Sequence, residues 1–409
     1  MSGQTAPPNG GTAVTVFLVA AEESGDLLGA ALMHALAART SGAVRLVGVG
    51  GREMEAEGLT TLASIKPQAL IGLGGVLRHL PTLIRSIRAT ANAAVAIRPD
   101  VLVIIDSPDF THRIARIVRA RCPTIPIVNY VSPSVWAWRP SRAPAMRAYI
   151  DRVLALLPFE PAAMARLGGP ACSYVGHPLI EQIDQLRPNP QEAKRRDADP
   201  PLLLVLPGSR AGEIRRLVPI FGQAIALLRE RYGMFELVLP TVPHLAARVR
   251  EATAGWAVKP RIIAERADKR AAFRSARAAL AKSGTVTLEL ALAGVPMVTA
   301  YRVTHFEAAL MRWVALVETV ILPNLVTGER FVPEFLQDAC TPQNLANALL
   351  PLLDDTPERR RQTGMFARFD SILETGGVTP SQRAADIVLN LAVPHSAAAT
   401  PRARCVASK

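Results

Sequence analysis

Short apolar runs alternate with helix-like segments along most of the chain, and this alternation limits the choice of fold more than any other feature of the sequence. Residues 14–21 form an apolar run of the kind that is buried on both faces of a parallel sheet. Further runs of this kind occupy residues 44–49, 101–105, 125–130 and 153–157. Strands and helices that alternate in this way indicate βαβ units wound around a parallel sheet.

The alternation is interrupted at residues 186–201, which contain four prolines and a charged Lys-Arg-Arg-Asp run. We interpret this segment as a linker. The pattern restarts after it, so the sequence predicts an N-terminal domain over residues 13–185 and a C-terminal domain over residues 202–375. Two doubly wound Rossmann-like domains in series are expected to face each other across a cleft, with ligands at the carboxyl ends of the strands.

The ends of the chain differ from these domains. Residues 1–12 are polar and rich in glycine and proline, and we expect a disordered tail there. Residues 380–393 have the apolar spacing of a last amphipathic helix. Residues 394–409 are expected to form a second disordered tail.

The net charge of +13 allows three classes of partner: nucleic acid, an anionic membrane surface or phosphorylated substrates. The arginines are scattered, and aromatic residues make up only 5% of the chain, so a stacking platform for nucleic acid is not expected. A general arginine bias of the genome is the alternative explanation for part of the excess.

No uncharged apolar run reaches the roughly 18 residues of a spanning helix, so we expect a cytoplasmic chain. Residues 70–98, however, combine leucine and isoleucine with several arginines, which is typical of a helix that lies on an anionic bilayer. Residues 311–316 could add to this face. An arginine-flanked core helix explains the pattern equally well.

The stretch Ser283-Gly284-Thr285 joins a strand-like run to a helix, and it predicts an anion site made of backbone N–H groups and hydroxyls. Glu289 lies within the next two turns and could accept hydrogen bonds from the hydroxyls of a ribose. The alternative is an ordinary capped helix with a surface glutamate.

The turn that contains Ser209 and Arg210 follows the first strand of the second domain. Its backbone N–H groups and the guanidinium predict a second anion clamp. Neither this turn nor the Ser-Gly-Thr turn has the spacing of a P-loop. Gly72 to Gly75 lacks the spacing of a dinucleotide fingerprint, and Asp197-Ala198-Asp199 is interpreted as a solvated charge cluster.

Two stretches of the first domain place carboxylates at strand ends. Glu22 and Ser24 lie in a turn with two further acidic residues, where a ligand could approach or where the charges could simply cap the next helix. Asp106 ends the strand at 101–105, and it is a candidate general base that His112 could assist. A plain turn is the alternative at Asp106.

Residues 129–139 carry two of the four tryptophans among small polar residues. Ser132 and Trp136 in this stretch suit a wall that contacts a sugar or an acyl chain, and a buried loop with core tryptophans is the alternative. The histidines and cysteines lack the spacing of metal ligands, so no metal is predicted.

Several short stretches between about residues 14 and 390 carry a resemblance to a known family. They are 23–26 (Glu-Ser-Gly-Asp), 105–110 (Ile-Asp-Ser-Pro-Asp-Phe), 130–139 (Tyr-Val-Ser-Pro-Ser-Val-Trp-Ala-Trp-Arg), 157–160 (Leu-Pro-Phe-Glu), 175–179 (Val-Gly-His-Pro-Leu), 206–210 (Leu-Pro-Gly-Ser-Arg), 283–285 with Glu289, and 322–325 (Leu-Pro-Asn-Leu). The chain resembles the lipid-A-disaccharide synthase family of inverting glycosyltransferases, which have the two-domain GT-B fold. The stretch 131–139 is the most specific of these matches.

The resemblance implies transfer of 2,3-diacylglucosamine from UDP-2,3-diacylglucosamine to the 6-hydroxyl of 2,3-diacylglucosamine 1-phosphate, without a cofactor. It implies a peripheral enzyme on the inner face of the inner membrane of a Gram-negative bacterium. It also implies that the last helix returns to the N-terminal domain. The oligomeric state is left open, with a homodimer as the candidate assembly.

Carried over by residue, the resemblance makes Asp106 the general base, with Glu22 also in the catalytic cleft. Arg210 and Ser209 would meet the UDP phosphates together with residues 283–285, and Glu289 would hold the ribose. Ser24, Asn324, Ser132 and Trp136 would line the cleft. Ala21 and Glu23 depart from the family's Gly-Glu-Ala-Ser-Gly-Asp turn. Another GT-B reaction, such as UDP-sugar epimerisation, and a non-catalytic membrane-surface protein are the competing hypotheses.

Overall fold

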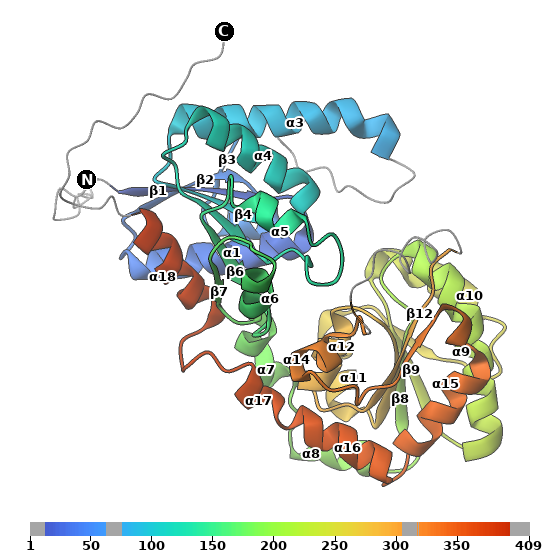
Figure 1. The fold of residues 1–409 in the computed structure, drawn as a ribbon. Helices are drawn as coiled ribbons and strands as arrows, with labels where there is room; N and C mark the ends of the chain where they lie inside the picture. Colours follow the sequence, from blue (N-terminus) through green and yellow to red (C-terminus); the bar gives the residue numbers. More distant parts are fainter. Residues whose placement is uncertain (1–12, 63–75, 305–316, 318, 393–409) are drawn as a thin grey trace, which may run out of the picture. The chain divides into compact units, whose positions relative to one another are not determined.

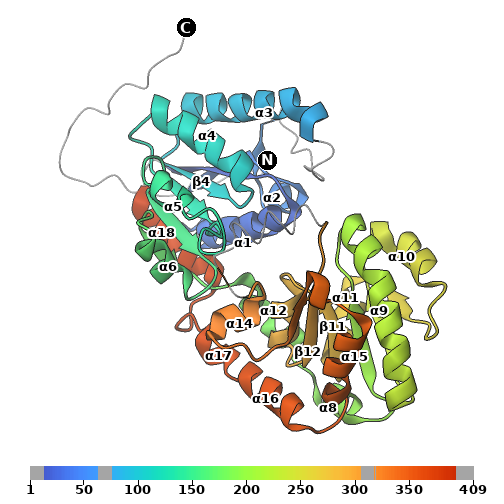
Figure 2. The same cartoon turned by 45° about the vertical axis from the view of Figure 1, so that its right-hand side comes forward.

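The computed structural model of the chain describes residues 13–62, 76–304, 317 and 319–392. The chain divides into two α/β units, which Figures 1 and 2 show in two views. Unit 1 comprises Met1–Pro178 and Thr375–Lys409, and unit 2 comprises Leu179–Glu374. The expected tails, the Gly72–Gly75 stretch, residues 311–316 and the first part of the 70–98 segment lie outside the described residues.

Unit 1 is built on a parallel sheet whose strands follow the order β3-β2-β1-β4-β5-β6-β7. The strands are β1 (Val14–Ala20), β2 (Val44–Val49), β3 (Thr60–Thr61), β4 (Val101–Ile105), β5 (Ile127–Tyr130), β6 (Arg152–Ala155) and β7 (Cys172–Tyr174). The helices are α1 (Glu23–Arg39), α2 (Arg52–Ala56), α3 (Val76–Ile97), α4 (Pro108–Arg121), α5 (Arg142–Met146), α6 (Glu160–Arg166) and α18 (Pro380–Ala392).

Strand β1 explains why the apolar runs of the sequence become buried strands. Its side chains alternate between two hydrophobic cores, because successive residues of a strand point to opposite faces of the sheet. Phe17 and Val19 pack with α3 and α4, whereas Val16 and Leu18 pack with α1 and α18. A strand that is covered on both faces needs an apolar residue at almost every position.

Helix α18 joins unit 1 although it lies at the far end of the chain. It packs along α1 and contributes Ala384, Ala385 and Val388 to the core beneath the sheet. An ion pair of 3.0 Å between Arg39 Nε and Asp386 Oδ1 also links α18 to the end of α1.

Unit 2 repeats this architecture with the strand order β10-β9-β8-β11-β12-β13, again with every pairing parallel. Its strands are β8 (Leu202–Leu206), β9 (Glu236–Pro240), β10 (Arg261–Ile263), β11 (Ala278–Lys282), β12 (Met297–Tyr301) and β13 (Glu334–Leu336). The prediction of two doubly wound α/β domains is confirmed.

The helices of unit 2 cover both faces of its sheet, and α9 and α15 lie side by side on one of them (Figure 2). They are α7 (Ile183–Leu186), α8 (Pro190–Asp197), α9 (Ala211–Tyr232), α10 (Ala246–Thr253), α11 (Arg266–Ser275), α12 (Val286–Leu292), α14 (Leu322–Thr327), α15 (Pro342–Leu349), α16 (Pro357–Phe366) and α17 (Phe369–Ile372). Short 3-10 turns lie at Pro178–Gln182, Pro243–Leu245, Gln337–Ala339 and Leu350–Leu352.

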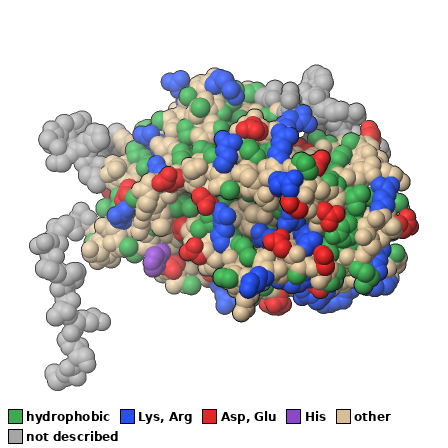
Figure 3. All heavy atoms as spheres, turned by 90° about the horizontal axis from the view of Figure 1, so that it is seen from below, with side chains coloured by type: hydrophobic (Ala, Val, Ile, Leu, Met, Phe, Trp, Pro, Cys, Tyr) green, Lys and Arg blue, Asp and Glu red, His purple; other side chains and the backbone are tan. Residues whose placement is uncertain are grey.

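The surface mixes charges of both signs. On the face seen in Figure 3, lysine and arginine side chains lie among acidic and hydrophobic ones and do not gather into one area. Among the described residues, the large hydrophobic side chains that are most exposed are Leu27, Ile84, Trp138 and Met234. No helix within the described ranges is both long enough and apolar enough to span a bilayer.

The segment 186–201, expected to be a linker, contains helix α8 and belongs to unit 2. Helix α8 begins with a capping box, in which the Asn189 side chain accepts from the N–H of Glu192 and the Glu192 side chain accepts from the N–H of Asn189. Glu192 also forms a 2.8 Å ion pair with Arg274 of α11. The division between the units therefore lies near Pro178 and Leu179, ahead of the segment that the prolines mark.

Arg196 is the centre of the contacts that hold α8 to unit 2. Its guanidinium donates to four carbonyl oxygens, those of Phe273, Arg274, Ala293 and Gly294, at 2.9 to 3.2 Å. Burial lowers the pKa of Arg196 to about 10, so the group stays charged at neutral pH. These carbonyls lie at the ends of α11 and α12, where a cation is favoured by the unpaired backbone oxygens.

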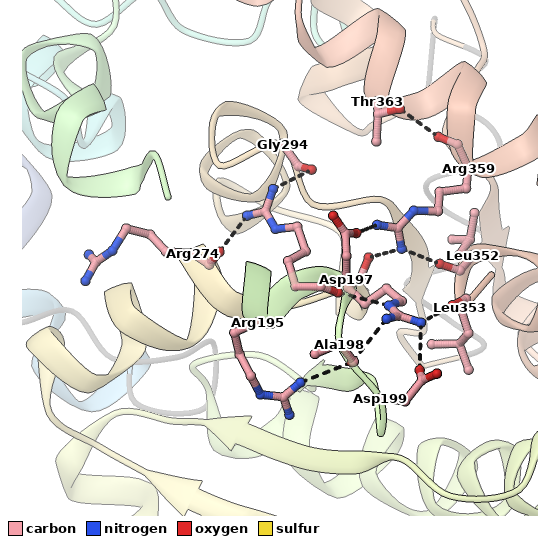
Figure 4. A network of polar contacts seen from close by, with 12 residues as sticks. Arg195, Asp197, Ala198, Asp199, Arg274, Gly294, Leu352, Leu353, Arg359 and Thr363 are labelled. Carbon is pink, nitrogen blue, oxygen red and sulfur yellow. Dashed lines mark hydrogen bonds and ion pairs between the residues drawn. The ribbon is translucent and has the colours of Figure 1, made fainter. Parts of the chain in front are cut away.

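The two aspartates of the Asp-Ala-Asp stretch are part of the same network (Figure 4). Arg359 reaches Asp197 at 3.2 Å and also donates to the carbonyl of Leu352, and Arg277 reaches Asp199 at 3.2 Å. The aspartate side chains are 76% and 80% exposed, which agrees with a solvated cluster, but each has a specific arginine partner.

Candidate functional site

A cavity of about 350 Å³ lies at the carboxyl ends of strands β8, β9 and β11 of unit 2. Most of the unit 2 residues that the sequence singled out line it, namely Ser209, Arg210, Gly284, Thr285 and Glu289. A parallel sheet collects its ligand-binding loops at this edge, because the loops that leave the strands all meet there. The position agrees with a nucleotide site.

The Ser283–Thr285 turn presents backbone donors to this cavity. The N–H of Ser283 donates to Ala300 at 3.0 Å, which continues the sheet. In the part of the chain that the structure describes, no hydrogen bond uses the N–H groups of Gly284, Thr285 and Val286. Ser283 itself is buried, and its hydroxyl donates to Glu334 at 3.4 Å, so it supports the turn from behind.

The turn at Ser209 and Arg210 is arranged differently from the anion clamp that the sequence suggests. Both N–H groups donate to one carboxylate oxygen, Oε2 of Glu213, at 3.1 and 3.2 Å. The chain's own carboxylate therefore takes these donors, and the Arg210 side chain, which is 80% exposed, is the part of the turn that stays available to a ligand.

Two lysines in the cavity were missed by the sequence analysis. Lys282, the last residue of β11, lies 3.1 Å from Glu213, and Lys269 of α11 lies 2.6 Å from Glu289. Glu289, expected to hold a ribose, therefore also has a cationic partner. A lysine at the end of an otherwise apolar strand is the signal that could have pointed to Lys282.

In unit 1 the structure brings Ser24 and Asp106 together. The Ser24 hydroxyl donates to Asp106 Oδ2 at 3.2 Å, although 82 positions separate the two residues. Asp106 and Ser107 have φ values of +52° and +45°, a left-handed conformation that is rare for residues other than glycine. The Thr111 hydroxyl donates to the Asp106 carbonyl at 2.7 Å and fixes this turn at the end of β4.

The acidic residues at the start of α1 have separate roles. Asp26 is buried and accepts hydrogen bonds from the N–H groups of Gly51, Glu53 and Met54, so it caps α2. Glu22 is exposed at the N-cap position of α1 and makes no capping hydrogen bond there. Of the two, only Glu22 is placed to meet a ligand.

The 131–139 loop is anchored by Trp136. Its indole N–H donates to Glu160 Oε1 at 3.3 Å, and its ring packs edge-on against Phe159. Burial raises the pKa of Glu160 to about 7, although hydrogen bonds from the backbone at Leu157 and from Trp136 act in the opposite direction. Trp136 is half-buried, and so the loop combines a core anchor with an exposed Trp138.

Two other residues that were predicted to line the cleft are buried. Ser132 is buried, and its hydroxyl lies 3.4 Å from the Pro133 carbonyl. The Asn324 side chain is buried too, and its amide bonds to the backbone of Phe331 and Val332. Neither residue lines the unit 2 cavity.

His112, which could assist Asp106, instead faces the interior of unit 1. Its Nδ1 lies 3.1 Å from the Tyr149 hydroxyl. Burial and then the charges of Arg142 and Arg116 lower the pKa of His112 to about 4, so the ring is neutral at physiological pH. Within the described residues no group of three or more His, Cys, Asp and Glu is placed to hold a metal ion.

Comparison with known proteins places the chain in a family. Residues 16–388 match the family model described as lipid-A-disaccharide synthetase. The lipid-A-disaccharide synthase of Rhodopseudomonas palustris (strain BisB18) is 61% identical over 376 residues, which is 92% of this chain and 95% of that protein. The Bradyrhizobium diazoefficiens protein of the same name is 59% identical over 374 residues, which is 91% of this chain and 95% of that protein.

Solved structures support the fold. The complex of S. aureus MnaA with UDP aligns with a TM-score of 0.60 and 15% identity, over 92% of this chain and 97% of that one. A likeness at this identity shows the GT-B fold alone. The family match and the close relatives go further: the chain belongs to the lipid-A-disaccharide synthase family of UDP-sugar glycosyltransferases.

Proposed function

We propose that the chain transfers 2,3-diacylglucosamine from UDP-2,3-diacylglucosamine to the 6-hydroxyl of 2,3-diacylglucosamine 1-phosphate, with inversion at the anomeric carbon. The observation that carries the proposal is the unit 2 cavity, which combines the Arg210, Lys269 and Lys282 side chains with unused backbone donors and Glu289. This set suits a nucleoside diphosphate, because cations and N–H groups meet the phosphates and a carboxylate meets the ribose hydroxyls.

In this proposal the Arg210 guanidinium and the N–H groups of Gly284 and Thr285 bind the two phosphates. As the bond between the sugar and UDP breaks, negative charge grows on the leaving phosphate. Donors that are already fixed in place stabilise that charge without reorganisation. Glu289, oriented by Lys269 at 2.6 Å, accepts hydrogen bonds from the ribose.

The acceptor chemistry is assigned to unit 1. Asp106 takes the proton from the 6-hydroxyl of the acceptor while that oxygen attacks the anomeric carbon from the face opposite UDP. The hydrogen bond from Ser24 and the fixed turn hold the Asp106 carboxylate in one orientation. Glu22 lies near the start of the adjacent helix α1 and contributes a second carboxylate to this end of the sheet.

We also infer that unit 1 touches the inner face of the inner membrane through α3. One side of α3 packs into the core through Ile87 and Ala91, and the other exposes Ile84, Arg85 and Arg88. The exposed side is apolar and basic together, as a helix on an anionic bilayer requires. The buried side agrees with the core-helix interpretation of the 70–98 segment, and the exposed side supports the membrane proposal.

The decisive experiment incubates the purified full-length chain with both acylated sugars in detergent and identifies the products by mass spectrometry. We expect a disaccharide 1-phosphate and one UDP for each disaccharide. A change of the UDP-sugar into an isomer when the acceptor is left out would support epimerisation instead. Absence of UDP release with both substrates present would support a non-catalytic binding protein.

A further inference from the structure

The proposed function counts Lys282 among the cations of the unit 2 cavity, but it gives no role to the ion pair between Lys282 and Glu213. Lys282 Nζ lies 3.1 Å from Glu213 Oε1, and the two side chains are only 17% and 12% exposed. Both residues line the unit 2 cavity. A largely buried ion pair loses hydration when it forms, so its presence at a binding site requires a physical explanation.

Glu213 connects the lysine to the turn at Ser209 and Arg210. One carboxylate oxygen meets Lys282, and the other accepts the N–H groups of Ser209 and Arg210. Gly208, with φ of +117°, makes room for this arrangement, because a Cβ atom there would lie 2.3 Å from Glu213 Oε2. The turn, the carboxylate and the ammonium therefore form one fixed unit.

Lys282 keeps donors for a ligand after this pairing. An ammonium group has three N–H donors, and Glu213 takes one side of it. The Tyr301 ring centroid lies 5.1 Å from Nζ and covers a second side. A Cβ atom added to Gly284 would lie 3.3 Å from Nζ, so the ammonium lies beside the turn whose N–H groups are unused within the described chain.

The charges of the cavity favour an anionic ligand. Three cationic side chains and two carboxylates line it, which leaves a net charge of +1 before a ligand enters. The ion pairs with Glu213 and Glu289 hold the two lysine side chains in place without a ligand. Binding of a diphosphate therefore costs little side-chain entropy.

We propose that Lys282 contacts the diphosphate of the UDP-sugar and that Glu213 is the positioning residue that holds Lys282 for this contact. The proposal rests on the proposed function, because it assumes that the cavity binds a uridine diphosphate. It assigns Lys282 and Glu213 specifically to the diphosphate and not to the uridine.

Calorimetric titration of the full-length chain with UDP and, separately, with uridine tests the contact. We expect Lys282→Met to weaken UDP binding about 10- to 100-fold, the effect of losing one charge-assisted hydrogen bond, and to leave uridine binding unchanged. Lys282→Gln, which keeps a polar side chain, should weaken UDP binding similarly and covers the case in which the methionine variant does not fold. Lys259→Met removes an exposed lysine outside the cavity and is the matched control.

A double-mutant cycle tests the positioning role. Glu213→Gln should weaken UDP binding severalfold in the otherwise unchanged chain, and it should have no further effect in the Lys282→Met background. An equal effect in both backgrounds, or tighter UDP binding by Glu213→Gln alone, would overturn the positioning role.

The outcomes separate this inference from the proposed function. If the unchanged chain binds UDP and the Lys282 variants bind it equally well, the contact is wrong while the nucleotide site stands. If the unchanged chain binds no UDP, the proposed function itself fails.

Discussion

At the scale of single residues, the turn at Asp106 is the most unusual feature of the first unit. Two consecutive residues other than glycine have left-handed backbone angles, and the Ser24 hydroxyl donates to the carboxylate. Such a conformation costs free energy and persists only where the surrounding structure enforces it. The orientation of the carboxylate is therefore set before a substrate arrives.

This gives a prediction for Asp106→Asn. Asparagine tolerates the left-handed conformation, so the turn should be kept while the base is lost. We expect turnover to fall about 100-fold or more, the usual contribution of general-base catalysis, with UDP affinity unchanged. Initial rates with both substrates saturating and titration with UDP measure the two quantities.

The neighbouring exposed carboxylate provides the control. Asp109 lies on the surface and pairs with Arg142. Asp109→Asn should keep near-normal turnover, and normal turnover in Asp106→Asn would remove Asp106 from the base assignment.

Glu160 gives a prediction about pH. Its pKa is raised from 4.5 to about 7 because its carboxylate is buried. Below pH 4.5 the group is protonated in both the folded and the unfolded chain. Between pH 4.5 and 7 the unfolded chain loses this proton first, so the stabilising contribution falls as the pH rises, by about 3 kcal/mol in total.

Urea unfolding at a series of pH values measures this contribution as a difference between the unchanged chain and Glu160→Gln. Between pH 4.5 and 7, the free energy of unfolding of the unchanged chain should decline relative to that of the variant. Above pH 7 the difference between the two free energies should stay constant. The comparison needs the variant because buried His177, whose pKa is lowered to about 4, acts in the opposite direction. Glu53→Gln, at an exposed position of the same unit, should leave the dependence of the unfolding free energy on pH unchanged. A difference between Glu160→Gln and the unchanged chain that stays the same at every pH would contradict the prediction.

At the scale of elements, helix α3 carries the proposed membrane contact. Arg85 and Arg88 are exposed beside Ile84, and a basic residue near an anionic bilayer contributes about 1 kcal/mol of binding. The variant Arg85→Gln/Arg88→Gln should therefore bind anionic vesicles about 30-fold more weakly, as measured by co-sedimentation. Arg147→Gln/Arg166→Gln removes two exposed arginines outside α3 and should bind as before; equal losses in both variants would indicate only a general effect of net charge.

Helix α8 shows where an element could not be anticipated from composition. Prolines and charges at 186–201 indicated an exposed linker, yet Pro190 is the first residue of a helix, a position where the missing N–H costs nothing. Most of the charged side chains have specific partners, and Arg196 in particular binds carbonyl groups that lie about 80 and 100 positions away. Local composition contains no information about contacts at such separations.

At the scale of the whole molecule, the sequence predicted both sheets well because each buried strand must be apolar on two faces. Strands β1, β2 and β4 lie within one residue of the expected runs. The site was predicted less completely. Ser283 and Ser132 lie in loops and Asn324 in the short helix α14, and all three side chains are buried. The pairing of Lys282 with Glu213 joins the end of β11 to α9, 69 positions away, and the sequence carries no sign of it.

The chain path through the two units also orders events during protein synthesis. Unit 2 is one continuous stretch, whereas unit 1 is interrupted by it and is completed by α18. A ribosome therefore finishes all of unit 2 before α18 emerges, and until then the apolar side of α1 that α18 later covers has no permanent neighbour. The hydrophobic core of unit 1 is therefore completed only after the chain that follows unit 2 has been synthesised.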